Sequence, residues 1–187
     1  MMWKKEASRW FLAQAPRLLG RSRRRPRRSL IADVALGALA GGVGKLAMAA
    51  VCGAVKRLER RDQVLFERVL RDGAEPATRL ALKLAQGIGA DLSPAGACKV
   101  GSALGWGGAL GEGALYGLLR HFAPRVSLGA GLLFGSLSWA LFHEGLPALL
   151  TLSPPLGKLP WVTHARGLAS HLAYGAATEG MRRTLLS

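Results

Sequence analysis

Ionisable side chains stand inside segments of this sequence that are otherwise small and apolar, and they are the residues best suited to chemistry. They are Lys45, Glu112, His143, Glu144, His164, His171 and Glu179. A histidine titrates near neutral pH, and a carboxyl group away from water holds its proton more readily, so together such groups can relay protons. The same groups can instead join helices through buried polar contacts.

Three interpretations of these residues stay open: structural contacts that set helix register, a proton or ion pathway, and a metal site. The metal site would combine His143, Glu144, His164, His171 and Glu179. His143 and Glu144 are adjacent, so they point about 100° apart on a helix, and the sequence has no HExxH spacing. We therefore predict no metal and no cofactor.

Motifs of catalysis are missing from the sequence. It contains no GxSxG elbow and no Walker loop, and "GGVGK" at residues 41–45 lacks the spacing of a phosphate loop. The two cysteines, Cys52 and Cys98, have neither zinc-site nor redox-pair spacing. We expect no catalytic residues and predict that the protein is not an enzyme.

Charged groups inside apolar helices should face one another, because each costs roughly 2.5–3.5 kcal/mol at the centre of a membrane helix. We predict a Lys45–Glu112 ion pair, since the two residues belong to successive apolar segments. A second cluster is predicted to join the remaining central groups. Its members are His143, Glu144, His171 and Glu179.

Four apolar segments carry these residues, at about 31–55, 100–120, 127–150 and 161–181. Some 20 apolar residues in a helix cross a hydrocarbon core of roughly 30 Å. The chain has 25 glycines in 187 residues; glycine weakens a helix in water but allows close helix contact in lipid. The predicted fold is all-α, an integral membrane bundle of about four transmembrane helices spanning residues 30–183.

The segment between the first two spans, residues 57–92, is polar and mixed in charge. Two helical pieces are expected here, at about 56–70 and 76–89, and the second begins with Pro76. We interpret it as an amphipathic segment that lies on the bilayer or caps the bundle. Ser93 and Pro94 predict the start of the next helix, and Pro147 predicts a kink in the third span.

The N-terminal arm, residues 1–29, holds ten Lys or Arg residues and one acid. Trp3 and Trp10 are seven residues apart, which predicts a short interfacial helix that contacts anionic lipid. A twin-arginine signal sequence at the start of the first span is an alternative.

The formal charge of +15 first suggests nucleic acid, but the basic residues are segregated from the apolar segments, so no nucleic-acid partner is expected.

The C-terminal half carries a family resemblance. "GALYGLLRHFAPRVSLGAGLLFGSLSWALFHEGLPALLTLSPP" followed by "LPWVTHARGLASHLAYGAATEGMRR" resembles the YagU-like bacterial inner-membrane family. The matching features are a glycine-rich span, a Pro-Pro turn before "LPW", a histidine in the last span, and Glu179 followed by Arg182 and Arg183. The resemblance covers about residues 30–56 and 100–185, and it implies an integral inner-membrane protein without implying a reaction.

We therefore expect a multi-pass protein of the bacterial inner membrane with a structural or accessory role and with the lipid bilayer as its partner. A small proton- or ion-conducting transporter-like protein is the first alternative, and a homo-oligomer would suit its short helices. A basic nucleic-acid-binding protein is the second alternative.

By the positive-inside rule both termini would be cytoplasmic, although residues 56–99 carry nine basic residues on the predicted outer side.

Overall fold

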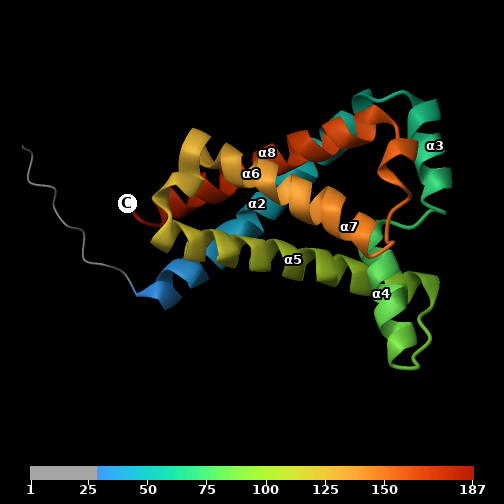
Figure 1. Ribbon diagram of the computed structural model, residues 1–187, viewed down its shortest axis with the longest axis horizontal. Coiled ribbons are helices and arrows are strands. Elements are labelled where there is room, and N and C mark those ends of the chain that lie inside the picture. Colours follow the sequence, from blue (N-terminus) through green and yellow to red (C-terminus); the bar gives the residue numbers. More distant parts are fainter. Residues whose placement is uncertain (1–28) are drawn as a thin grey trace, which may run out of the picture.

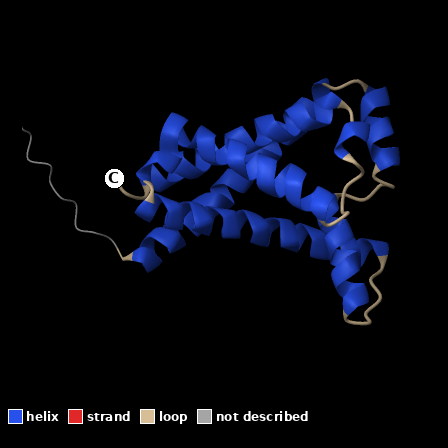
Figure 2. Cartoon of the chain, in the orientation of Figure 1, coloured by secondary structure: helices blue, strands red, loops and turns tan. Residues whose placement is uncertain are grey.

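The computed structural model describes residues 29–187, and in that part of the chain it is helical without strands, as the all-α prediction requires (Figure 2). Four long helical segments form the bundle, and two short helices stand at one end of it (Figure 1). The predictions for the N-terminal arm, including the helix with Trp3 and Trp10, concern residues that lie outside the described part of the chain.

The helices α2 (Leu30–Leu58) and α5 (Pro94–Phe122) are the longest, each with 29 residues. At 1.5 Å per residue each is about 44 Å long, which exceeds the thickness of a hydrocarbon core. Local capping sets their starts. The Ser29 side chain accepts a hydrogen bond from the Ala32 amide at 3.2 Å, and Ser93, followed by Pro94, accepts one from the Gly96 amide at 3.1 Å.

Glycines bring α2 and α5 into backbone contact near the first half of α2. A Cβ atom added to Gly113 would lie 2.7 Å from the Cα of Gly41 and even closer to the carbonyl oxygen of Gly37. Gly117 meets the backbone of Asp33 and Val34 in the same way. From this contact the two helices diverge towards the end of the bundle where α3 and α4 stand (Figure 1).

The last helix, α8 (Trp161–Thr184), packs against α2 and α6 and has a polar interior face. Its buried residues are Thr163, Arg166, Gly167, Ser170, His171, Tyr174, Gly175, Thr178 and Glu179. Close approach again depends on glycine, since a Cβ atom on Gly175 would lie 2.9 Å from the Cα of Gly135. The interior of the bundle therefore combines many small and polar residues with one aromatic cluster of Tyr116, Phe134 and Tyr174.

The third apolar segment is not one helix over 127–150. It is divided into η1 (Pro124–Gly131), α6 (Leu132–Ser138), η2 (Trp139–Gly145) and α7 (Leu146–Leu149). Gly129, Ala130 and Gly131 have φ values of 62°, 56° and 94°, so a regular helix begins only at Leu132.

Pro147 does not produce the simple kink that the sequence predicted. The turn before it, η2, is a wider π-helical turn in which the Leu146 amide donates to the carbonyl oxygen of Leu141. A proline cannot donate the next hydrogen bond of an α-helix and crowds the carbonyl four residues earlier, so the backbone widens there. The wide turn contains both His143 and Glu144.

The amphipathic segment contains α3 (Arg61–Leu70) and α4 (Pro76–Gly87), and a short turn, η3 (Leu156–Lys158), precedes α8. The first predicted piece is interrupted, because extended backbone at Glu59 and Arg60 separates α2 from α3. Helix α3 buries the acidic Glu67 and exposes its apolar side chains. They are Leu65, Phe66 and Val69. An outward apolar face of this kind suits the interfacial region of a bilayer.

Two helical stretches, Leu30–Leu58 and Arg125–Leu149, are long and apolar enough to cross a membrane. In their most apolar windows only 22 % and 28 % of the residues are buried, whereas the core helix of a soluble protein would be mostly buried. Length and apolar composition therefore mark two of the four predicted spans as candidate crossing segments.

Candidate functional site: the central cavity

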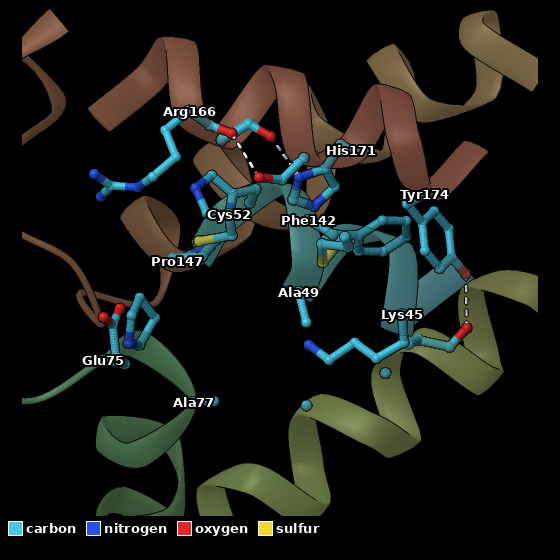
Figure 3. A pocket seen from close by; sticks show the side chains of 18 of the residues that line it. Lys45, Ala49, Cys52, Glu75, Ala77, Phe142, Pro147, Arg166, His171 and Tyr174 are labelled. Atoms are coloured by element: carbon cyan, nitrogen blue, oxygen red, sulfur yellow. Dashed lines mark hydrogen bonds between the residues drawn. The ribbon is translucent and has the colours of Figure 1, made fainter. Parts of the chain in front are cut away.

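A cavity of about 670 Å³, here called the central cavity, lies among α2, α4, α5, α7 and α8 (Figure 3). It occupies the space that opens where α2 and α5 diverge from their glycine contact. The face of α2 that lines it repeats every three or four residues, as one side of a helix does. That face consists of Lys45, Met48, Ala49, Cys52, Gly53 and Lys56.

Four of the seven residues singled out in the sequence line the central cavity. They are Lys45, Glu112, His143 and His171. Each comes from a different predicted span, so only the packing of the bundle brings them together. Sequence analysis placed these residues inside apolar segments but assigned Lys45 and Glu112 to one group and the two histidines to another.

The predicted Lys45–Glu112 ion pair is not formed. Glu112 instead accepts a close hydrogen bond from the Ser138 hydroxyl of α6. Within residues 29–187, the Lys45 ammonium has no hydrogen-bond or ion-pair partner among the protein's own groups. Its side chain extends into the open space of the central cavity (Figure 3). Both side chains line the same cavity, so the prediction was right about the cavity-facing sides of α2 and α5 and wrong about the direct contact.

His143 and His171 face each other with their ring centroids 4.9 Å apart. His171 Nδ1 lies 2.8 Å from the carbonyl oxygen of Gly167, and because a carbonyl only accepts, Nδ1 carries the proton. Glycine at position 167 leaves room for this contact, since a Cβ atom there would lie 2.8 Å from His143 Nε2 and the imidazole would have to move. The π-helical turn and this glycine together place the two imidazoles in contact.

His164 and Glu144 form a separate pair near the end of the cavity. His164 Nδ1 lies 2.9 Å from a carboxylate oxygen of Glu144, and its Nε2 lies 3.2 Å from the carbonyl oxygen of Leu156. These contacts join η2, the turn at 156–158 and the first turn of α8. The pair therefore fastens the connection between the third apolar segment and α8.

Glu179 belongs to a different site from the histidines, contrary to the second predicted cluster. It is 1 % exposed, near the C-terminal end of α8, and accepts a hydrogen bond of 2.7 Å from the Tyr116 hydroxyl. Arg182 and Arg183 donate to the same carboxylate at 2.9 and 2.6 Å, and Arg120 lies 4.0 Å away. We call these five residues the Glu179 cluster. Eight residues separate His171 from Glu179, which is about 12 Å along a helix.

A second cluster of buried charges, which sequence analysis did not select, stands at the opposite end of the bundle. Arg166 of α8 donates to Glu59, which follows α2, and to Glu67 of α3, and Glu67 also accepts from Arg71 at 3.0 Å. We call these four residues the Arg166 cluster. The sequence contained a signal for Arg166, because an arginine inside a predicted span needs a buried partner. Nothing in the sequence identified Glu59 or Glu67 as that partner.

The Arg166 cluster determines the ionisation of Glu67, which lies in α3 outside the predicted spans. Burial alone would raise the pKa of the Glu67 carboxyl. The hydrogen bond and charge of Arg166, together with the charge of Arg71, outweigh burial and hold this pKa below its ordinary value. The carboxylate is therefore charged at neutral pH and fastens α3 to α8.

The five residues considered as metal ligands are distributed over three places: the imidazole contact, the His164–Glu144 pair and the Glu179 cluster. In residues 29–187, the structure brings no three His, Cys, Asp or Glu side chains into a group that could hold a metal ion. Apart from the paired charges of its lining and the Cys52 thiol, the central cavity offers the chemistry of an ammonium, a carboxyl group and two imidazoles.

The described residues form a helical bundle, and two of its helical stretches have the length and apolar composition of membrane-crossing helices. Among known proteins, the chain is similar to Inner membrane protein YagU of Escherichia coli (strain K12), with 33 % identity over 70 residues. The match covers 37 % of this chain and 34 % of that protein, so the chain matches about a third of the length of its relative.

This partial similarity supports the YagU-like resemblance found in the sequence. No family model matches the chain, and no solved structure matches it.

Proposed function

We propose that the chain is a multi-pass inner-membrane protein that crosses the bilayer with α2, α5, the α6–α7 segment and α8. We further propose that it is a small transporter-like protein that conducts protons or ions by way of the central cavity. The observation that carries this proposal is the meeting of Lys45, Glu112, His143 and His171 around one cavity. Ionisable residues within a membrane segment usually mark a pathway for ions or protons.

The distribution of apolar side chains supports a lipid environment. Large apolar residues project outwards along α2 and along the α6–α7 segment, among them Leu39, Leu46 and Leu141, which are 59–63 % exposed. The buried face of α8 consists mainly of polar residues and glycines. A chain in water would reverse this arrangement, because burying apolar area is the main favourable contribution to folding there.

The buried ionisable groups are of two kinds, those in ion pairs and those without a paired charge, and we assign a different role to each kind. The Glu179 cluster and the Arg166 cluster each combine carboxylates with arginines in close contact. The structural role predicted for polar groups suits these two clusters, since paired charges hold helices in register. The Lys45 ammonium and the two cavity imidazoles form no ion pair with a carboxylate, and together with the Glu112 carboxyl group they are the groups we assign to conduction.

The central cavity extends towards the end of the bundle that carries α3. A smaller hollow of about 350 Å³ lies beside α3 and shares Lys56, Glu67, Arg71 and Glu75 with the central cavity. These four residues form what we call the polar mouth. Towards the other end, the close contact of α2 with α5 and the Glu179 cluster close the bundle. An access path from one face is the arrangement expected of a transporter in one of its states.

Proton flux into proteoliposomes tests this proposal. We expect the protein to carry flux and Glu112→Gln to abolish most of it, because the amide neither binds nor releases a proton at neutral pH. Asp91→Asn is the matched control, since Asp91 is an exposed carboxylate outside the cavity. Flux that is absent, or that is equal in both variants, would contradict the conduction proposal.

Recovery in the soluble fraction without detergent would contradict the membrane location and favour the nucleic-acid alternative.

A further inference from the structure

The central cavity combines the ammonium group of Lys45 with apolar walls, and this combination defines the ligand that it fits. We propose that the cavity binds an organic monoanion with an apolar body, such as a medium-chain carboxylate, with the carboxylate at Lys45. The inference rests on the proposed function and deepens it, because it names a class of solute that the cavity would accept.

Charge is the first argument. The Lys45 ammonium lies in a cavity between helices, where a charge without a counterion costs free energy. The other cations of the lining are already paired, since Lys56 lies 3.6 Å from Glu75, and Arg71 and Arg166 contact Glu67. Glu112 accepts a hydrogen bond from Ser138 and makes no direct ion pair with Lys45, although the two charges still interact across the cavity. A ligand with a single negative charge beside the Lys45 ammonium would therefore supply the direct ion pair that the protein's own groups do not form.

Room at the ammonium is the second argument. Gly105 of α5 faces Lys45, and a Cβ atom added there would lie 3.7 Å from Nζ. Gly108, also on the cavity wall, has nothing within 4 Å of such an atom. The absence of side chains on this part of α5 leaves space beside the ammonium for a small anionic group.

The walls give the third argument. Between Lys45 and the polar mouth the cavity is bounded by Met48, Ala49 and Cys52 of α2 on one side. Phe142 and Pro147 of the third apolar segment lie on another (Figure 3). Eleven residues separate Lys45 from Lys56, so the path is about 16 Å long. An apolar chain attached to the carboxylate would follow these walls towards the mouth.

The size of the cavity agrees with a ligand of this kind. Its volume of about 670 Å³ lies within the range of pockets that enclose small organic ligands, about 300–1,000 Å³. The chemical match is an ion pair at one end and buried apolar area along the rest. A small inorganic anion would form the ion pair with Lys45 but would leave the apolar walls of the cavity without contact.

Native cysteines provide the test. Cys52 lines the cavity, and Cys98 is exposed on α5 outside it. In the full-length protein in detergent, we expect decanoate to slow maleimide labelling of Cys52 and to leave the labelling of Cys98 unchanged. At about ten times its dissociation constant, decanoate should slow the labelling of Cys52 about tenfold. Decanol and decylamine, which share the chain but lack the negative charge, should not protect.

Variants at Lys45 separate charge from hydrophobic contact. Lys45→Met should label normally at Cys52 and lose the protection by decanoate, whereas Lys45→Arg should keep it. Lys56→Met, which removes a cation already paired at the mouth, is the matched control and should also keep it. Equal protection by decanol, or protection that persists in Lys45→Met, would overturn the inference.

The possible failures are distinguishable. If Cys52 labels readily and decanoate never protects it, the solute class is wrong while proton flux that depends on Glu112 still supports the proposed function. If Cys52 does not react with the maleimide although Cys98 does, the cavity is closed to solutes, and both the inference and the access path are overturned.

Discussion

The hydroxyl of Tyr116 donates a hydrogen bond of 2.7 Å to the carboxylate of Glu179, and this bond joins α5 to α8 at the closed end of the bundle. Both side chains are fully buried. The carboxylate also receives Arg182 and Arg183, so one acidic group holds two helices and balances neighbouring positive charges.

Removing either partner of this bond should destabilise the bundle to a different extent. Tyr116→Phe should cost about 1–3 kcal/mol, because it removes one buried donor and leaves the carboxylate with its arginines. Glu179→Gln should cost more, about 3–5 kcal/mol, because the arginines then lack their counterion. Thermal unfolding in detergent measures both. Arg183→Ala is the control, since that side chain is 60 % exposed, and a loss as large as that of Glu179→Gln would contradict the assignment.

Two glycines in the same helix should respond oppositely to alanine. Gly113→Ala places a methyl group against the backbone of α2, so we expect a loss of about 1–3 kcal/mol. Gly111→Ala has nothing within 4 Å of the new atom, so we expect no loss and up to about 1 kcal/mol of gain from helix propensity. Melting temperatures in the same detergent test the pair. Equal effects would show that α2 and α5 do not meet at Gly113.

The Glu67 carboxylate should make stability depend on acid pH. Its pKa in the folded protein is lower than the ordinary value of 4.5, so its contribution to the free energy of unfolding is fully present above pH 4.5. That contribution is lost as the pH falls below 4.5 and through the lowered pKa. We expect the melting temperature to fall over this range and Glu67→Gln to reduce the fall. Asp62→Asn, at an exposed residue, should leave the pH profile unchanged.

Cys52 and Cys98 should react from the same face of the membrane. Cys52 lies in the last quarter of α2 and Cys98 in the first turns of α5, and α3 and α4 connect these two ends. A membrane-impermeant maleimide applied to intact vesicles should therefore label both residues from one face and neither from the other. Cys52→Ala and Cys98→Ser assign the signals. Labelling from opposite faces would contradict the crossing of α2 and α5 in opposite directions, and the reactive face would assign the side of residues 56–99.

Local signals in the sequence predicted the elements that depend on near neighbours. Ser93 and Pro94 predicted the start of α5, and Pro76 predicted that of α4, because capping and proline geometry involve only adjacent residues. The third apolar segment was less predictable. Its helix begins late because residues 129–131 adopt positive φ where Gly131 and Gly175 come into contact, and that contact joins residues far apart in the chain.

The candidate site was predictable as a set of residues and not as an arrangement. Apolar surroundings identified Lys45, Glu112, His143 and His171 one by one. Whether Lys45 faces Glu112 or a cavity depends on the rotation of α2 against α5. The wide turn before Pro147 further changes the direction in which His143 points, and Gly167 of α8 leaves the space that the imidazole occupies.

By itself the sequence determined that this chain is helical and that its polar groups are carried on apolar, glycine-rich segments, since composition and periodicity follow from the order of residues alone. Only the tertiary structure decided which charges neutralise one another. Glu179 pairs with arginines, Arg166 pairs with Glu59 and Glu67, and Lys45 faces open space. The physical reason is that Coulomb attraction and hydrogen bonding act over a few ångströms, and distances of that size between side chains of different helices arise only when the helices have packed together.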